Sequence, residues 1–148
     1  MENNIIIRAY KTTDKPEIID LLKLNTPEYF SLEEEKDLIH YLDHEIEQYY
    51  VVEYDKKVVG SGGINFSEDQ KMGRISWDIL DPAYQGKGIG NQLLKHRVEK
   101  LKTFDTVEKI SVRTSQLAYK FYEKFGFKLI EVQKDYWAKG FDLYRMEL

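Results

Sequence analysis

The stretch DPAYQGKGIGNQLL covers residues 81–94 of this 148-residue chain. Its three glycines, Gly86, Gly88 and Gly90, stand at every second position directly before a stretch with helical apolar periodicity. With a strand before them and a turn at Pro82, the first amides of that helix would lack internal acceptors and carry the positive end of its dipole. Glycine lets an anion approach such amides, so the stretch predicts either an anion site or a turn that binds nothing.

Two common phosphate-binding motifs do not match this stretch. The sequence GKGIG (86–90) lacks the Gly-x-x-x-x-Gly-Lys-Ser/Thr spacing of a P-loop. It also differs from Gly-x-Gly-x-x-Gly, and it follows a predicted hairpin in the middle of the chain rather than opening a βαβ unit. Both nucleotide-binding motifs are therefore excluded.

Composition indicates one soluble globular domain over residues 1–148. Hydrophobic residues make up 42% and charged residues 32%, and no repeat or linker divides the chain. The absence of cysteine excludes disulfides, thiolate metal sites and cysteine nucleophiles. A net charge of −4 gives no support to nucleic-acid binding. No apolar run approaches a membrane span and the N-terminus does not resemble a signal peptide, so we expect a cytoplasmic protein without a membrane partner.

Hydrophobic patterning predicts alternating groups of strands and helices. Expected strands cover 5–10, the hairpin 49–66, 73–80, 107–113, 127–133 and 141–148; expected helices cover 14–24, 31–48, about four turns after the glycines, and 115–125. Ser31 and Glu34 have the spacing of a capping box. This order predicts an α+β fold with a mixed sheet and flanking helices.

The strand at 73–80 is expected to alternate between two faces. Strict alternation places Ile75, Trp77 and Ile79 on one face and Ser76, Asp78 and Leu80 on the other.

Two motifs then point to a family. The run from Gln85 to Gly90 resembles the Gln/Arg-x-x-Gly-x-Gly/Ala signature of GNAT-superfamily N-acetyltransferases. SQLAYKFYEKFGF (115–127) is similar to the second family motif, Asn-x-x-Ala-x-x-x-Tyr-Glu-x-x-Gly-Phe. With similar segments at 5–22 and 49–64, the resemblance covers nearly the whole chain. It implies a three-layer fold, with a mostly antiparallel mixed sheet of about seven strands flanked by about four helices.

The resemblance implies acetyl-coenzyme A as co-substrate, without a metal. In the family the glycine-loop amides hold the pyrophosphate, and the pantetheine arm contacts the end of the preceding strand. Ser115 falls where the family has an asparagine, with Thr114 or Gln116 as substitutes. The expected contacts come from Ile79, Leu80, Gln85, Gly86, Lys87, Gly88, Ile89, Gly90, Asn91 and Ser115.

The family also implies direct transfer from thioester to amine. Tyr122 takes the place of the motif tyrosine and is the candidate general acid; otherwise it is a core tyrosine. The positions where relatives often carry a glutamate base hold Arg74 and Ser111. Asp78 is the candidate base, acting through a water molecule. Alternatively it is an ordinary polar residue, and ordered water takes the proton or the amine arrives neutral.

The acceptor is expected between the first two helices and the loop joining the last strands. Tyr29, Phe30, Tyr136 and Trp137 are candidates for an aromatic wall, with Glu33–Glu35 attracting a cation. Alternatively, the aromatics pack and the acids complement a helix dipole. His40 and His44 have metal-compatible spacing, but a solvated helix face is the favoured interpretation.

These observations favour an N-acetyltransferase that acts on a primary amine, preferably of a small molecule. The alternatives are a protein N-terminal or lysine acetyltransferase, or a non-catalytic coenzyme A-binding module on the same fold. The expected partner is an amine acceptor, small-molecule or protein, and a homodimer is considered.

Overall fold

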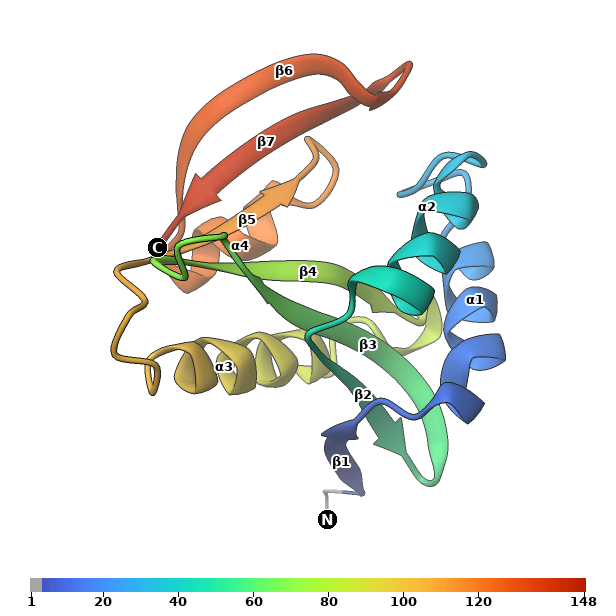
Figure 1. Ribbon diagram of the computed structural model, residues 1–148. Coiled ribbons are helices and arrows are strands. Elements are labelled where there is room, and N and C mark those ends of the chain that lie inside the picture. The colour runs from blue at the N-terminus through green and yellow to red at the C-terminus, as the bar shows by residue number, and fades with distance from the viewer. Residues whose placement is uncertain (1–3) are drawn as a thin grey trace.

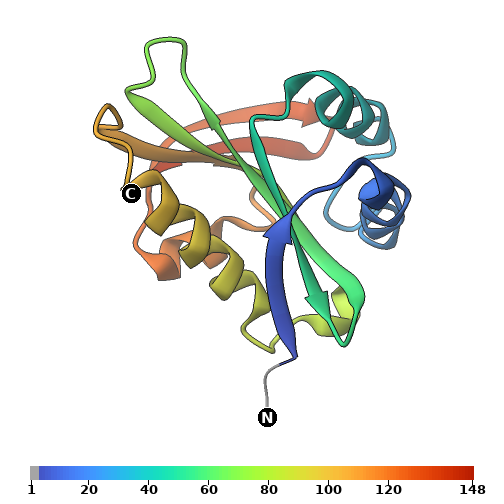
Figure 2. The ribbon, with the colours of Figure 1, turned by 60° about the horizontal axis from the view of Figure 1, so that its bottom comes forward.

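Seven strands form one sheet that carries helices on both faces (Figures 1 and 2). The computed structural model describes residues 4–148. The elements in chain order are β1 (Ile5–Ala9), η1 (Thr12–Asp14), α1 (Lys15–Leu24), α2 (Glu34–His40), η2 (Tyr41–Glu45), β2 (Gln48–Tyr54), β3 (Lys57–Phe66), β4 (Met72–Leu80), η3 (Pro82–Tyr84), α3 (Ile89–Leu101), β5 (Lys109–Thr114), α4 (Tyr119–Phe125), β6 (Lys128–Ala138) and β7 (Phe141–Glu147). None of the helices in this described part is long and apolar enough to cross a membrane.

The layers confirm the predicted α+β class. The strand order is β1-β2-β3-β4-β5-β7-β6, and every neighbouring pair is antiparallel except β4–β5. One core cluster joins α1 and α2 to the sheet, and a second joins α3 and α4 to its other face. The helices thus cover opposite faces, as Figure 2 shows.

The parallel pair β4–β5 is short, and this opens the sheet at its centre. Pairing runs only from Met72–Ile75 on β4 to Lys109–Val112 on β5. The rest of β4, up to Leu80, continues beside β3 alone. The two central strands therefore part after Ile75, which leaves one backbone edge of β4 without a strand partner among the described residues.

A β-bulge at Trp77 accompanies this parting and corrects the alternation predicted for 73–80. Ser61 pairs with Ile79 but Gly63 pairs with Ser76, so β4 carries one extra residue, and Trp77 has a φ of +49°. An extra residue reverses the side-chain alternation beyond it. Ile75 consequently joins the core under α3 and α4, whereas Trp77 and Ile79 pack on the α1–α2 side.

The single helix predicted over 31–48 is wrong in extent. Helix α2 begins at Glu34, passes into the π-helical turn η2 and ends before Gln48, which already pairs with Ile64 in the sheet. The pairing of Gln48 with β3 ends the helical segment, although apolar residues in the sequence follow a helical spacing up to that point. Only half of the capping box forms: the Glu34 carboxylate accepts the Ser31 N–H at 2.8 Å, while the Ser31 hydroxyl has no partner.

Smaller differences concern the C-terminal elements. Strand β5 runs two residues later at its start than the predicted 107–113, and helix α4 begins only at Tyr119, after a turn from Ser115 to Ala118. Strand β6 extends to Ala138, well beyond the predicted 133. With β7 it forms the long curved hairpin at the top of Figure 1.

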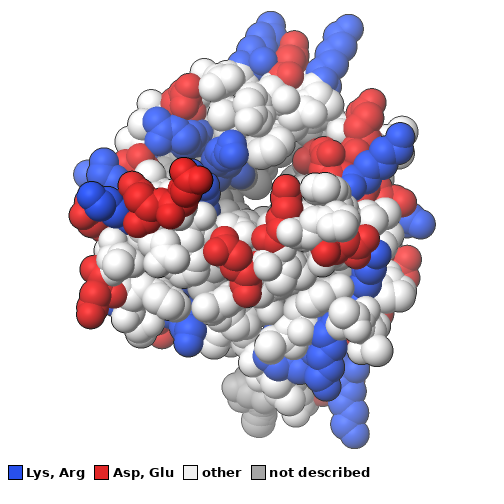
Figure 3. Space-filling view, in the orientation of Figure 1, with Lys and Arg blue, Asp and Glu red and all other residues white. Residues whose placement is uncertain are grey.

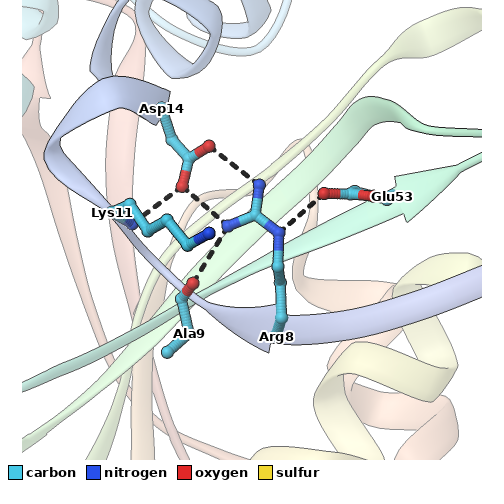
Figure 4. Close-up of polar contacts among 5 residues, drawn as sticks. All are labelled: Arg8, Ala9, Lys11, Asp14 and Glu53. Carbon is cyan, nitrogen blue, oxygen red and sulfur yellow. Dashed lines mark hydrogen bonds and ion pairs between the residues drawn. The ribbon is translucent and has the colours of Figure 1, made fainter.

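A charged network fixes the start of α1 against the sheet edge (Figure 4). Arg8 on β1 donates from Nη1 and Nη2 to the two carboxylate oxygens of Asp14, each at 2.9 Å, and from Nε to Glu53 on β2 at 2.6 Å. Asp14 also accepts the backbone N–H of Lys11. The Arg8 hydrogen bonds lower the pKa of Asp14, so this carboxylate stays charged under its helix.

Candidate active site

The glycine loop forms an open cradle at the N-terminus of α3. Gly86 and Gly88 have φ values of +80° and +79°, and a Cβ added at either position would meet nothing within 4 Å. The first intrahelical bond runs from the Gln92 N–H to the Gly88 carbonyl at 3.0 Å. The amides of Ile89, Gly90 and Asn91 therefore have no acceptor inside the helix. This geometry suits a bound anion.

The rest of the predicted cradle lies around these amides. Gln85 and Lys87 are exposed beside the glycines, and Asn91 is exposed in the first turn of α3. Ile89 is buried, and its side chain packs in the core under the loop rather than facing a ligand. Any contact between Ile89 and an anion would therefore use its backbone.

The end of β4 leads from the open sheet edge to this cradle. Ile79 and Leu80 pair with Ser61 and Gly60 of β3, on the side away from β5. The Leu80 carbonyl accepts from Nδ2 of the buried Asn25 at 3.0 Å, which also ties the end of α1 to β4. Because this carbonyl is engaged, a ligand lying along the edge would meet the neighbouring backbone groups.

Tyr122 and Asp78 meet in the opening between β4 and β5. The Tyr122 hydroxyl, from α4, donates a hydrogen bond to Oδ2 of Asp78 on β4. Burial raises the pKa of Tyr122 well above its usual value, and the Asp78 charge raises it further. The phenol therefore carries its proton throughout the physiological range, as a proton donor must. The structure brings together the two residues predicted as acid and base.

Arg97 completes this cluster from α3. Its side chain is fully buried, and its guanidinium forms an ion pair with Oδ1 of Asp78. Nη1 donates to the Gly63 carbonyl at 3.1 Å and Nε to the Leu93 carbonyl at 3.2 Å. Arg97 thus links β3, β4 and α3 directly behind the carboxylate that holds the Tyr122 hydroxyl.

Gly62 is a glycine because the Asp78–Arg97 pair lies against it. A Cβ at this position would overlap Oδ1 of Asp78 and Nη1 of Arg97, the latter at 2.6 Å. The residue stands on β3 opposite the β4 bulge. The bulge turns Asp78 toward α3 and α4, and the missing side chain at 62 gives the ion pair its space.

Ser115 lies at the start of the turn before α4 and is buried. Its Oγ accepts the Leu117 N–H at 3.2 Å, and its carbonyl accepts from Ala118 and Tyr119. The two substitutes considered for it face the β6–β7 hairpin: the Thr114 carbonyl accepts from Trp137, and Gln116 bonds to Gly140 and Asp142. The Ser115 hydroxyl accepts the bond from Leu117 without using its own proton, which it can donate to a ligand.

Arg74 and Ser111, at the positions where a glutamate base was sought, stand at paired register positions of β4 and β5. Arg74 is exposed and Ser111 is buried, and neither accepts a proton from an ammonium group. Asp78 is the carboxylate that the structure places in the opening next to Tyr122.

Three of the four aromatic candidates on the acceptor side fall into two groups. Phe30 stacks on Trp77 with ring centroids 6.2 Å apart and an interplanar angle of 16°. Tyr136 and Trp137 on β6 contact each other edge to face at 5.0 Å. Tyr29 is half-buried in the turn after α1 and its N–H donates to Asn25. Trp77 was not among the acceptor-site residues predicted from the sequence. It stacks on Phe30 and directly precedes Asp78 in the chain, so it connects the Phe30 ring to the opening between β4 and β5.

Acidic side chains gather on the α1–α2 side of the hollow seen in Figure 3. Of the three glutamates considered, Glu33 is exposed and Glu35 half-exposed, whereas Glu34 turns inward to the Ser31 amide. The exposed rings of His40 and His44 lie 4.9 Å apart. Within residues 4–148 no group of three or more potential metal-ligating residues comes together.

A comparison with models of known protein families identifies the family of this chain. Residues 16–127 match the model of the Acetyltransferase (GNAT) family. The chain belongs to this family. Its match spans both sequence motifs, the open β4 edge, Arg97 and the Tyr122–Asp78 pair, and it places the chain among acyltransferases.

Individual GNAT relatives differ in what they acetylate. An N-alpha-acetyltransferase of Sulfurisphaera tokodaii is 31% identical, over 95% of this chain and 90% of its own length. An amino-acid acetyltransferase of Pasteurella multocida is 26% identical over 89% of this chain, which spans only 29% of that relative. An aminoglycoside 6'-N-acetyltransferase solved with coenzyme A has the same fold: TM-score 0.76, 15% identity, covering 97% of this chain and 96% of the other.

Proposed function

We propose that this GNAT chain transfers the acetyl group of acetyl-coenzyme A directly to a primary amine, with small-molecule amines favoured as acceptors. One observation carries the proposal. The open backbone edge of β4 joins an anion cradle, at Gly86–Asn91, to the buried phenol of Tyr122 and its half-buried partner carboxylate, Asp78. A long molecule with an anionic end and a reactive end matches this arrangement.

The cofactor end of the proposal rests on the glycine loop. The free amides of α3 and its dipole would hold the pyrophosphate, with Gln85, Lys87 and Asn91 around it. The pantetheine arm would lie along the unpaired edge of β4 at Ile79 and Leu80, near the Ser115 hydroxyl. The coenzyme A in the aminoglycoside acetyltransferase, a protein of the same fold, supports this choice of ligand.

The chemical step follows from the two side chains in the opening. Asp78 takes a proton from the ammonium group through a water molecule, using a lone pair of Oδ2 that the Tyr122 hydroxyl leaves free. The amine nitrogen attacks the thioester carbonyl, a C–N bond forms and the C–S bond breaks. Tyr122 gives its proton to the leaving sulfur. The hydrogen bond between Asp78 and Tyr122 then returns the proton from the carboxyl group to the phenolate, and the second proton that the nitrogen loses as the amide forms leaves to water.

The acceptor is proposed to bind between the Phe30–Trp77 pair and the Tyr136–Trp137 pair. Aromatic faces and the exposed Glu33 favour a cationic amine. A second candidate acceptor is the N-terminal amine of a protein, because the archaeal N-alpha-acetyltransferase is similar over nearly its whole length.

An acceptor panel tests both candidates together. Coenzyme A release and acetylated product would be measured with spermidine, an aminoglycoside, free amino acids, a peptide with a free α-amine, and an N-blocked lysine peptide. We expect turnover with at least one amine, highest with a small polycationic one. Highest turnover with the α-amine peptide would select the second candidate. Stabilisation by acetyl-coenzyme A without any turnover would identify a binding module instead.

A further inference from the structure

Arg97 is the largest fully buried side chain of the described protein, and a buried guanidinium without an adequate partner is costly. It lies on α3, between the glycine cradle and the C-terminal end of that helix. Its position calls for an explanation beyond packing, because a methionine or leucine would fill the same core without a desolvated charge.

The contacts of Arg97 are directed at one carboxylate. Two of its nitrogens are fixed by the carbonyls of Leu93 and Gly63, which hold the guanidinium plane in place. The remaining Nη2 meets Oδ1 of Asp78, and the other oxygen of that carboxylate accepts from Tyr122. The guanidinium is fully buried, and Asp78 links it to the Tyr122 hydroxyl.

We propose that Arg97 is a positioning residue: it orients the Asp78 carboxylate so that the Tyr122 hydroxyl stays in place at the opening between β4 and β5. This inference rests on the proposed function. The carboxylate has two oxygens with separate tasks. Oδ1 is buried against the guanidinium, and Oδ2 remains for the phenol and for a water molecule from the acceptor side.

The positive charge of Arg97 also affects the pKa values of several neighbouring groups. Its positive charge favours the ionised form of the tyrosines around it, against the burial that opposes ionisation. Burial lowers the pKa of His96, and the Arg97 charge lowers it further. The titratable groups facing the pair are Tyr122 from α4, Tyr41 from η2, Tyr49 and Tyr50 from β2, and His96 from α3. Among them, Tyr122 is the group hydrogen-bonded to Asp78.

The test compares Arg97→Gln with Arg97→Lys in steady-state kinetics. A displacement of a reacting group by about 1 Å costs on the order of 100-fold in rate, so kcat of R97Q is expected to fall ten- to hundredfold while KM for acetyl-coenzyme A stays near the wild-type value. R97K keeps a cation opposite Oδ1 of Asp78, so its kcat is expected to lie between those of R97Q and wild type.

A second pair of variants keeps the proposal testable if R97Q does not fold. Gly62→Ala forces a methyl group against both members of the ion pair without removing a charge. Gly60→Ala, on the same strand, places its methyl group no closer than 3.3 Å to its neighbours and serves as control. We expect G62A to lower kcat at unchanged KM for acetyl-coenzyme A and G60A to leave kcat within about twofold of wild type.

The outcomes separate the two proposals. An active wild type whose R97Q or G62A variant keeps kcat would overturn the role of Arg97 alone. Equal losses of kcat in G62A and G60A would overturn it as well. A wild type that binds acetyl-coenzyme A and acetylates no amine would overturn the proposed function, and the role of Arg97 with it.

Discussion

Replacing Gly88 by glutamate is expected to abolish coenzyme A binding while the protein still folds. Gly88 is the N-cap of α3 in the left-handed region, and its missing side chain leaves open space over the free amides. A glutamate there places bulk and a negative charge where the account puts the pyrophosphate. Gly140, in the turn between β6 and β7, supplies the matched control.

The control variant G140E is expected to lose folding stability as G88E does, but without repulsion between the new carboxylate and the pyrophosphate. Gly88 and Gly140 have φ values of +79° and +85°, and a Cβ at either would meet nothing within 4 Å. Each Gly→Glu change is therefore expected to cost about 1–2 kcal/mol of unfolding free energy through its backbone alone. At Gly88 a carboxylate about 4 Å from one phosphate charge adds a repulsion of about 4 kcal/mol at an effective dielectric constant of about 20. This energy corresponds to an increase of about 1000-fold in Kd.

Titration calorimetry with coenzyme A measures the difference, and thermal unfolding without ligand checks that both variants are folded. The expected result is wild-type Kd for G140E, no measurable binding for G88E, and similar melting temperatures for the two variants. A G88E protein that binds coenzyme A with wild-type affinity would refute the assignment of the glycine loop as the anion cradle.

Three further changes test other parts of the account. Tyr122→Phe is expected to lower kcat by about 10²- to 10⁴-fold with unchanged Kd for coenzyme A, whereas Tyr119→Phe on the same helix keeps wild-type kcat; equal kcat in both would remove the acid role. Trp77→Gly relieves the positive φ but deletes the indole beside the opening, so KM for the amine is expected to rise about tenfold, as the loss of about 1.5 kcal/mol implies; an unchanged KM would place the acceptor elsewhere. Asp14→Asn is expected to lose about 2 kcal/mol at pH 7 by chemical denaturation. Because Arg8 lowers the folded-state pKa of Asp14, wild type has this stability above the unfolded-state value near 4 and loses it as pH falls through the folded-state value, a dependence that D14N should lack.

The sequence alone predicted the parts of the fold that short-range chemistry controls. The order of elements, the glycine loop before α3 and the position of Tyr122 follow from turn residues, periodicity and motif spacing. The helix predicted over 31–48 ended early, because residues from Gln48 onward gain more from pairing with β3 than from continuing a helix. The helix and strand propensities of a segment do not show which distant segment it pairs with.

Arg97 shows why the rest of the site was missed. It stands four residues after Leu93 and four before Leu101, both buried, so helical spacing alone puts it on the inward face. The residue type argues the opposite, because arginine is rarely fully buried without a partner. The partner, Asp78, faces α3 only because of the bulge at Trp77, and a one-residue bulge leaves no reliable trace in the hydrophobic pattern.

In the proposed complex, one ligand lies along the open edge of β4, with its anionic end at the glycine loop and its sulfur at Tyr122. A crystal structure of the protein with coenzyme A would test this placement. We expect pyrophosphate oxygens on the amides of the first turn of α3 and the coenzyme A sulfur within hydrogen-bonding reach of the Tyr122 hydroxyl. Pyrophosphate bound elsewhere, or a sulfur that lies away from the opening between β4 and β5, would contradict it.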